Sequence, residues 1–304
     1  MDIPVTAVPD APRDGALPAG EAAAIAVDAL SVVYPNGTVG LQPTSLAFAR
    51  GEFTVLLGPS GAGKSTLLRA LNGLVPATQG SVQVHGIGSI VARAALRRHR
   101  RRCAMVFQQH QLIGRLTTLK NVLTGRLAYH TTLRSFWPLP IADKRIALDC
   151  LDRVGLLDCA LKRVDELSGG QQQRVGIARA IAQQPSILLA DEPVASLDPA
   201  TSVKVLGLIH SICKADGITA VVSLHQVHLA RQFADRVIGI GAGRVVFDGP
   251  PSRIDAAALT AIYGSLDSAG IEDTETRFSS PAAPGSTPVL PVRAITAALE
   301  ELPR

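Results

Sequence analysis

The chain has 304 residues, 47% of them hydrophobic and 18% charged, with 30 lysines and arginines against 25 aspartates and glutamates. This length allows a full hydrophobic core, and no run of about 20 apolar residues could span a bilayer. Asp2, Pro4 and Asp10 stand where a secretory signal needs a basic end and an unbroken apolar run, so we expect a cytosolic chain whose membrane role would come from a partner. Reduced, packed thiols are predicted, because neither C-x-x-C pairs nor histidines at zinc spacing accompany the cysteines Cys103, Cys150, Cys159 and Cys213.

Composition divides the chain into three parts. Residues 1–22 are rich in Ala, Pro, Gly and Asp, and residues 265–304 are rich in Pro, Ala and Ser, so both are predicted to be flexible tails. Between them, in residues 23–264, short apolar runs alternate with helical patterns. That alternation is typical of an α/β domain with a parallel sheet covered by helices.

A glycine-rich loop separates the strand-like run FTVLL at 53–57 from a helical pattern. Its sequence is a complete phosphate-binding G-x-x-x-x-G-K-[ST] pattern: Gly58, Pro59, Ser60, Gly61, Ala62, Gly63, Lys64 and Ser65. The glycines let backbone N–H groups close around a β-phosphate. Lys64 would supply positive charge to the β- and γ-phosphates, and the Ser65 hydroxyl could ligate Mg²⁺.

The segment RAALRRHRRR at 93–102 holds much of the excess positive charge. Arg93, Arg97 and Arg101 fall on one helical face at four-residue spacing. Nucleic-acid binding is one interpretation of such a face, but no aromatic residues interleave to stack bases. A solvated helix face is therefore the favoured interpretation.

Strand-like runs stop after the run CAMVF, which leads directly into Gln108. Two helical patterns follow, TLKNVLTGRLAYH and IADKRIALDCLDRVGLL, and they flank the stretch LRSFWPLP at 133–140 with the only tryptophan of the chain. We therefore expect a helical subdomain, at about 112–166, inserted into the α/β core.

The stretch LSGGQQQR at 167–174 predicts a second anion site. Its two glycines open onto a helical pattern in which Val175, Ala178 and Ala182 recur. Exposed N–H groups and the positive end of the helix dipole suit a phosphate. A second phosphate site has no evident use in a chain that already holds a complete phosphate loop.

Two more strand-like runs end in polar side chains. The run SILLA leads into Asp191 and Glu192, and the run ITAVVSL leads into His225. Asp191 would hold Mg²⁺ through its water shell, and Glu192 is placed to polarise an attacking water. Because ligands gather at the carboxyl ends of parallel strands, we expect Lys64, Gln108 and these three side chains at one edge of the sheet.

In this order, these motifs resemble those of the ATP-binding cassette (ABC) ATPases, over residues 24–262. The matching positions are Tyr34 for the aromatic that stacks on adenine, Gly58 to Thr66 for the Walker A motif, Gln108 for the Q-loop, Leu167, Ser168, Gly169, Gly170 and Gln171 for the signature, Asp191 and Glu192 for the Walker B end, Ser196, Leu197 and Asp198 for the D-loop, and His225 for the switch histidine.

The resemblance implies a RecA-like P-loop NTPase core with a mostly parallel sheet, an N-terminal antiparallel β part and an inserted helical subdomain. It implies ATP and Mg²⁺ as ligands. The expected metal-site residues are Ser65, Gln108 and Asp191, and the expected catalytic residues are Glu192, His225 and Gln108.

The resemblance also implies an answer to the second phosphate site. In this family two cassettes face each other head to tail, and the signature of one touches the γ-phosphate held by the other. Ser168 and Gly170 would then act in trans, with Gly169, Gln171 and Asp198 at the same interface.

Finer features resemble the ATP-binding subunits of bacterial phosphonate importers. They are LADEPVASLDP, SLHQVHLA, FQQHQLIGRLTTLKNVLTGRL and the insert LRSFWPLP. This implies a peripheral homodimer on the cytoplasmic side of the inner membrane, under a permease fed by a periplasmic or lipid-anchored phosphonate-binding protein. The Q-loop and insert would meet the permease, although LRSFWPLP could equally be a buried aromatic anchor.

We expect no nucleic-acid partner, because the sequence lacks a long coiled-coil insert, a zinc-finger spacing and a second cassette. The resemblance implies no direct contact with the transported substrate. Two alternatives stay open at this point. One is an importer for phosphate, phosphite or polar amino acids, because its catalytic motifs would be the same. The other is a soluble cassette ATPase that works without a permease.

Overall fold

The structure is a computed structural model, and it describes residues 23–108, 111–131 and 139–264. The predicted tails and most of the stretch LRSFWPLP lie outside the described residues. All elements described below belong to one compact unit of the chain.

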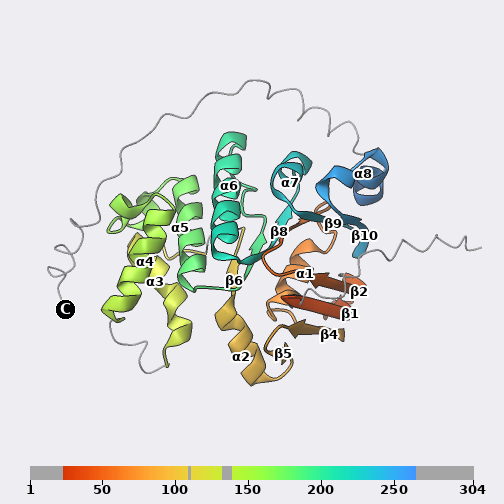
Figure 1. The fold of residues 1–304 in the computed structure, drawn as a ribbon, viewed down its shortest axis with the longest axis horizontal. Coiled ribbons are helices and arrows are strands. Elements are labelled where there is room, and N and C mark those ends of the chain that lie inside the picture. The colour runs from red at the N-terminus through yellow and green to blue at the C-terminus, as the bar shows by residue number, and fades with distance from the viewer. Residues whose placement is uncertain (1–22, 109–110, 132–138, 265–304) are drawn as a thin grey trace, which may run out of the picture. The chain divides into compact units, whose positions relative to one another are not determined.

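A six-stranded sheet forms the centre of this unit (Figure 1). Its strand order is β10-β9-β3-β8-β7-β6, and every neighbouring pair is parallel except β9 with β10. The strands are β3 (Phe53–Leu57), β6 (Cys103–Val106), β7 (Ile187–Asp191), β8 (Thr219–Leu224), β9 (Arg236–Gly241) and β10 (Arg244–Gly249). The predicted, mostly parallel sheet is confirmed.

A second sheet is wholly antiparallel and has the order β2-β1-β4-β5. Its strands are β1 (Ile25–Val33), β2 (Val39–Phe48), β4 (Gln79–Val84) and β5 (Gly88–Ser89). This is the antiparallel β part that the family resemblance implied.

Helices occupy the segments between the strands. The α-helices are α1 (Lys64–Leu71), α2 (Arg93–Arg102), α3 (Thr118–Leu123), α4 (Ile141–Arg153), α5 (Gly169–Ala182), α6 (Pro199–Asp216), α7 (Val227–Phe233) and α8 (Ala256–Tyr263). Short 3₁₀ helices are η1 (Thr124–Tyr129), η3 (Leu157–Cys159), η4 (Val164–Glu166) and η5 (Pro251–Arg253). None of the helices within the described ranges has the length and apolarity needed to cross a membrane.

The helical insert differs in detail from its sequence pattern. The pattern at 118–130 predicts one helix, but α3 ends after six residues and the chain tightens into η1. Gly125 lies at this change, and a Cβ there would stand 2.3 Å from the carbonyl oxygen of Arg179 on α5. Close contact between η1 and α5, which the local pattern does not encode, therefore accompanies the change in helix type.

Two hydrophobic cores lie on the two faces of the six-stranded sheet. Phe53, Val55 and Leu57 of β3 point into the core shared with α5 and α6, whereas Leu56 points into the core shared with α1 and the antiparallel sheet. Because successive side chains of a strand point to opposite faces of the sheet, β3 contributes residues to both cores. A strand buried on both faces must be apolar throughout, which explains the continuous apolar runs of the sequence.

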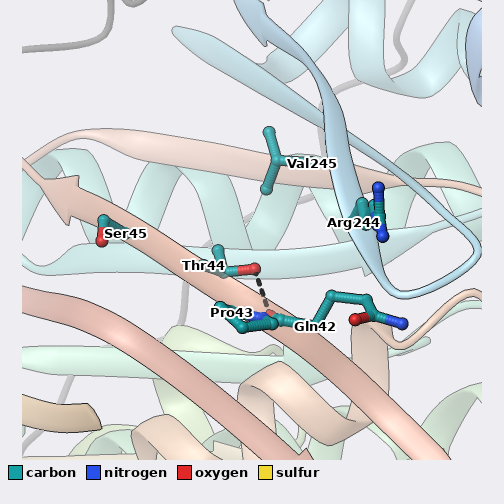
Figure 2. A pocket seen from close by; sticks show the side chains of 6 residues that line it. All are labelled: Gln42, Pro43, Thr44, Ser45, Arg244 and Val245. Carbon is teal, nitrogen blue, oxygen red and sulfur yellow. Dashed lines mark hydrogen bonds between the residues drawn. The ribbon is translucent and has the colours of Figure 1, made fainter. Parts of the chain in front are cut away.

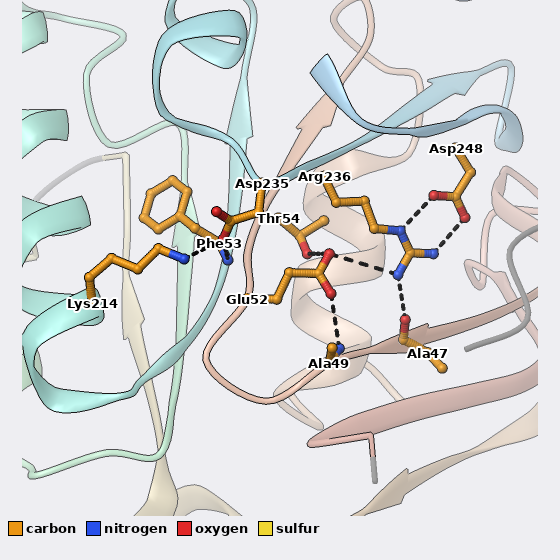
Figure 3. A network of polar contacts seen from close by, with 9 residues as sticks. All are labelled: Ala47, Ala49, Glu52, Phe53, Thr54, Lys214, Asp235, Arg236 and Asp248. Atoms are coloured by element: carbon orange, nitrogen blue, oxygen red, sulfur yellow. Dashed lines mark hydrogen bonds and ion pairs between the residues drawn. The ribbon is translucent and has the colours of Figure 1, made fainter. Parts of the chain in front are cut away.

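A polar network joins the two sheets near their edges (Figure 3). Arg236 on β9 forms two hydrogen bonds of 2.6 Å with Asp248 on β10 and donates to the carbonyl oxygen of Ala47 on β2 at 2.7 Å. Glu52 lies 3.9 Å from the same guanidinium. Two carboxylates thus neutralise a largely buried arginine that holds the antiparallel sheet against the central one.

The four cysteines are free thiols, and three of them are buried. Burial raises the pKa of Cys150 to about 11 and that of Cys213 to about 12. These two groups are therefore protonated and unreactive near neutral pH. Three of the four thiols are packed inside the domain, as predicted.

Candidate active site

The glycine-rich loop at 58–63 connects β3 to α1 through backbone that only glycine fits. Gly58 has a φ of 154°, and a Cβ there would lie 2.2 Å from the carbonyl oxygen of Ile240. Gly63 has a φ of 108°, and a Cβ there would lie 2.6 Å from the carbonyl oxygen of Gly40. The loop is therefore fitted tightly against β9 and β2, and a glycine-rich loop of this kind can turn its N–H groups toward a phosphate.

Lys64 places its ammonium group in the mouth of this loop. Its Nζ donates to the carbonyl oxygens of Gly58 at 2.7 Å and Pro59 at 2.9 Å. Burial lowers the pKa of Lys64, and the nearby carboxylates of Glu192 and Asp191 oppose that shift. A cation beside backbone N–H groups, with Ser60 and Gly61 exposed at the rim, fits a polyphosphate group.

Asp191, the last residue of β7, lies against the first turn of α1. Its Oδ1 accepts hydrogen bonds from Ser65 Oγ at 2.7 Å and from Ser223 Oγ at 3.0 Å. Arg69 lies 3.6 Å from Oδ2. Hydroxyl and carboxylate oxygens at the end of a phosphate loop are the ligands that Mg²⁺ prefers, so Ser65 and Asp191 fit the predicted metal.

Glu192 follows in the left-handed backbone region, with a φ of 48°. Its N–H donates to Ser223 Oγ at 2.9 Å, and its Oε1 lies 2.5 Å from Nε2 of His225. A glutamate at positive φ is strained and needs its surroundings to hold it. The turn directs the carboxylate of Glu192 toward the histidine, whereas the preceding carboxylate of Asp191 points toward α1.

His225 is supported from the far end of the described chain. The hydroxyl of Tyr263 on α8 donates to the carbonyl oxygen of His225 at 3.1 Å. Burial raises the pKa of Tyr263 to about 12, so this hydroxyl keeps its proton at neutral pH. Helix α8 thereby holds the backbone that carries the histidine.

Tyr34 lies beside the start of α1. Its hydroxyl and that of Thr66 are 3.0 Å apart. A Cβ on Gly40 would meet Cε2 of the tyrosine ring at 2.6 Å, so the ring packs closely against β2. This position, next to the glycine-rich loop, suits the base of a nucleotide whose phosphates lie in the loop.

Gln108 stands apart from this cluster. It follows β6, which pairs with β7 in the register Val106 with Ala190, so it leaves the sheet at the same edge as Asp191. Its side chain is exposed, and none of the hydrogen bonds that the described site residues form involves it. Its assignments to the metal and to catalysis stay predictions.

The signature residues form the start of α5. Ser168 and Gln171 make a capping box, in which each side chain bonds the other's backbone N–H. Gly170 is close to Thr201 on α6, because a Cβ on the glycine would lie 3.1 Å from Cγ2 of that threonine. Asp198 caps α6 by accepting from the N–H of Thr201 at 3.0 Å.

The starts of α5 and α6 therefore lie side by side, and Ser168, Gly169 and Asp198 are exposed there. Hydrogen bonds from Thr201 lower the pKa of Asp198. Among the described residues, no hydrogen bond or ion pair connects the signature to the glycine-rich loop. Within one chain the structure does not bring the two predicted phosphate sites together.

Ser223 and Tyr263 are site residues that the sequence reasoning missed. Ser223 is fully buried, and its hydroxyl contacts both acidic residues of the site. A single hydroxyl in the otherwise apolar run TAVVSL was a signal that could have found it. Tyr263 carries no local signal, because its contact depends on how α8 packs.

A hollow of about 320 Å³ is lined by residues of β2 and β10 (Figure 2). Its lining residues are Gln42, Pro43, Thr44, Ser45, Arg244 and Val245. The turn before Arg244 is tied to the loop, since the N–H of Gly243 donates to the carbonyl oxygen of Ala62 at 2.9 Å. The hollow therefore lies beside the turn that holds the glycine-rich loop in place. Its strands, β2 and β10, carry none of the predicted catalytic residues.

Comparison with known proteins places these features in a family context. The family model described as "ABC transporter" matches residues 41–195. The phosphite import ATP-binding protein PxtA of Stutzerimonas stutzeri is 67% identical over 241 residues, covering 79% of this chain and 87% of the relative. A phosphonates import ATP-binding protein of Nostoc sp. is 60% identical over 249 residues, covering 82% of this chain and 95% of the relative.

A similar fold occurs among solved structures. The dimeric structure of a bacterial ABC transporter cassette has a TM-score of 0.66 and 34% identity to this chain, and the match covers 75% of this chain and 98% of that one. The same cassette has also been solved as a dimer in a post-hydrolysis state with ADP and Pi bound, with the same TM-score and identity.

Proposed function

Because the chain belongs to the ABC transporter family, we propose that it is the ATP-hydrolysing subunit of an importer that takes up organic phosphonates through a separate membrane permease. The observation that carries the ATPase part is one continuous hydrogen-bonded path. It runs from Ser65 through Asp191, Ser223 and Glu192 to His225. The path connects the phosphate loop to the acid and the histidine that hydrolysis requires.

In this proposal the glycine-rich loop binds the β- and γ-phosphates of ATP through its N–H groups, and Tyr34 packs against adenine. Lys64 exchanges its two carbonyl acceptors for phosphate oxygens, which restores a full charge partner to a partly desolvated ammonium. Mg²⁺, when bound, would supply positive charge that offsets the negative charge of the phosphates. Ser65, Asp191 and Gln108 are the side chains that would hold it.

Glu192 orients the attacking water and accepts its proton as the water oxygen bonds to the γ-phosphorus. The bond between that phosphorus and the bridging oxygen of ADP breaks in the same displacement. His225 keeps the Glu192 carboxylate in position and faces the γ-phosphate. Ser223 fixes the backbone of the glutamate, so these residues are held in place before substrate arrives.

The signature acts across a homodimer in this proposal. Ser168 and Gly170 lie at an exposed helix start, and the helix dipole there favours an anion. A γ-phosphate held by the second subunit supplies that anion. The dimeric cassette among the similar structures supports this arrangement.

The transported compound is assigned from relatives, because this chain contacts no substrate in the proposal. Relatives named for phosphonate import, at 60%, 57% and 56% identity, support an organic phosphonate. Phosphite is the second candidate, since the relative at 67% identity is named for phosphite import. Both compounds are small tetrahedral phosphorus oxyanions, so one type of machine serves either.

The remaining partners follow from the importer assignment. The subunit would lie at the cytoplasmic face of the inner membrane, with the Q-loop and the helical insert against the permease. A periplasmic or lipid-anchored binding protein would deliver the phosphonate. Ile141, at the start of α4, is 64% exposed and would belong to this permease-facing surface.

The test is reconstitution with the candidate permease in liposomes. ATP hydrolysis is recorded while the binding protein is presented empty or loaded with a phosphonate, phosphite, phosphate or an amino acid. Stimulation by the phosphonate alone supports the whole proposal. Stimulation by phosphite alone keeps the importer and changes its cargo, and ATP hydrolysis that ignores every partner refutes the transport role. A Glu192→Gln subunit measured in parallel gives the background.

A further inference from the structure

The arginine face of α2 is the largest charged feature that the active site does not use. We define this face as the six arginines of the helix: Arg93, Arg97, Arg98, Arg100, Arg101 and Arg102. All six are exposed, whereas Ala95 and His99 are buried beneath them. At about 100° per residue, the six side chains fan over roughly 200° of the helix surface.

These charges lack compensation within the described residues. The helix contains no acidic residue, and none of its arginines forms an ion pair with a described carboxylate. Arg100 donates to a carbonyl oxygen, that of Gly73, at 2.7 Å. Six neighbouring cations without counter-charges repel one another, so an anionic partner would lower the energy of this face.

The face is held rigidly. His99 is fully buried, and its Nε2 lies 2.8 Å from the carbonyl oxygen of Leu71 at the end of α1. Gln183 donates to the carbonyl oxygens of Arg100 at 2.6 Å and Cys103 at 3.2 Å. Helix α2 is therefore fixed against the end of α1 and against α5, and the arginines project from a fixed base.

The location of the face separates it from the nucleotide. Helix α2 leads straight into β6, so it lies at the edge of the sheet where the parallel strands start (Figure 1). The glycine-rich loop lies where β3 ends, at the opposite edge. An anion bound by α2 would therefore lie at one edge of the sheet, and ATP bound by the glycine-rich loop would lie at the opposite edge.

The helical insert is the direct neighbour of this face. Tyr129 on η1 donates to the carbonyl oxygen of Gln183 at 2.7 Å, and Gln183 in turn bonds the end of α2. Two exposed apolar side chains lie next to α2. Val91, just before the helix, is 83% exposed, and Leu74, which follows the Arg100 partner Gly73, is 46% exposed. Exposed apolar groups beside a cationic helix face are typical of surfaces that touch a bilayer.

We propose that the arginine face of α2 binds the anionic phospholipid headgroups of the membrane that holds the permease. The inference rests on the proposed function, because the insert beside α2 is where the permease would dock. Guanidinium groups bind phosphate oxygens in a bidentate manner, and Val91 and Leu74 would enter the headgroup layer. Nucleic acid fits less well, since the helix offers no aromatic side chain for stacking bases.

The test is vesicle flotation with the purified full chain, without permease or ATP. Vesicles contain phosphatidylcholine alone or phosphatidylcholine with phosphatidylglycerol. We expect binding to the anionic vesicles only, and weaker binding as salt rises. The triple variant Arg93→Gln, Arg97→Gln, Arg101→Gln leaves His99 and Arg100 in place. Each arginine contributes about fivefold to partitioning, so its partition coefficient should fall on the order of 100-fold.

The matched control is the triple variant Arg50→Gln, Arg244→Gln, Arg253→Gln, which removes the same charge from exposed positions elsewhere. It should bind the anionic vesicles within about fivefold of the parent. An equal loss in both triples, or equal binding to both vesicle types, overturns the proposal. So does a loss of duplex DNA binding in the α2 triple with vesicle binding unchanged, which would make the face a nucleic-acid surface.

Failure of this inference is distinguishable from failure of the proposed function. Flotation requires neither permease nor hydrolysis, so a negative result leaves the importer assignment to the liposome assay. Basal ATP hydrolysis of the α2 triple, measured without vesicles, should equal that of the parent and shows that the variant is folded. A triple variant that lost basal hydrolysis would contradict the separation of the two edges on which the inference depends.

Discussion

Replacing Ser223 by alanine tests the path that joins the phosphate loop to Glu192, the proposed general base. The change removes a hydroxyl that donates to Asp191 at 3.0 Å and accepts from the N–H of Glu192 at 2.9 Å. A hydrogen bond to a charged group contributes about 1.5–3 kcal/mol, and a buried N–H left without an acceptor costs about 1–3 kcal/mol. Asp191 retains Ser65 and Arg69, so we expect a total loss of about 3 kcal/mol in the free energy of unfolding.

The kinetic effect should be concentrated in kcat. Glu192 has a strained backbone, with a φ of 48°, and Ser223→Ala removes one of the contacts that hold it there. A loss of about 1.4–2.7 kcal/mol in transition-state stabilisation corresponds to a fall in kcat of about 10- to 100-fold. KM for ATP should change little, because the loop and Lys64 are untouched. Steady-state hydrolysis over a range of ATP concentrations separates the two quantities, and urea unfolding gives the stability.

Thr54→Val is the matched control. Thr54 is also fully buried, and its hydroxyl donates to a carboxylate, Glu52 Oε1, at 3.1 Å (Figure 3). It lies near the start of β3, away from Asp191 and Glu192. The control should lose about 1.5–3 kcal/mol of stability and keep the parent kcat. Parent-level kcat in Ser223→Ala, or an equal fall in both variants, would refute the positioning role.

Three further predictions concern the remaining parts of the molecule. Glu192→Gln should lower kcat by about 10²- to 10⁴-fold while ATP binding persists and an ATP-bound dimer accumulates on size exclusion; turnover near the parent rate would exclude a general-base role. Ser168→Arg should leave ATP affinity of the monomer, measured by equilibrium dialysis, within about twofold of the parent, because the serine is proposed to contact only ATP held by the second subunit. The same variant should abolish ATP-dependent dimers in sedimentation, and dimers that survive would contradict action in trans. Asp143→Asn should cost about 3 kcal/mol, because it leaves Arg126 buried without its charge partner at 2.8 Å. Burial raises the pKa of Asp143, but hydrogen bonds from Arg126 and His130 outweigh burial and hold that pKa below its usual value. The ion pair therefore stabilises the protein at neutral pH, and this contribution is lost as pH falls. Urea unfolding across the acid range should show a smaller loss of unfolding free energy in the variant than in the parent, and parallel plots of stability against pH would refute the linkage.

Much of the active site could be predicted from short stretches of sequence. The residue types of the loop at 58–65 carry their own chemistry, and the apolar run before Asp191 identifies a strand that ends in a carboxylate. In a parallel sheet all such strand ends meet at one edge. The contacts of Ser65 with Asp191 and of Glu192 with His225 follow that rule across 126 and 33 residues of chain.

Other features needed the packed structure. Ser223 could be seen in the sequence only as a polar exception, and its two partners depend on the register of β8 against β7, where Asp191 pairs with Ser223. Tyr263 reaches His225 only because α8 packs beside β9 and β10. The early end of α3 likewise accompanies a close contact with α5 that its own helical pattern does not contain.

By itself, the sequence determined the phosphate chemistry, the α/β class and the order of the motifs, because these depend on residue type and on apolar periodicity within a few turns or one strand. Only the tertiary structure decided which hydroxyl holds Glu192 and how the arginine face of α2 is anchored. It also decided that, among the described residues of one chain, the signature makes no hydrogen bond or ion pair with the glycine-rich loop. Those outcomes depend on contacts between segments far apart in the chain. Such contacts form when the packing of two cores sets strand register and helix position together.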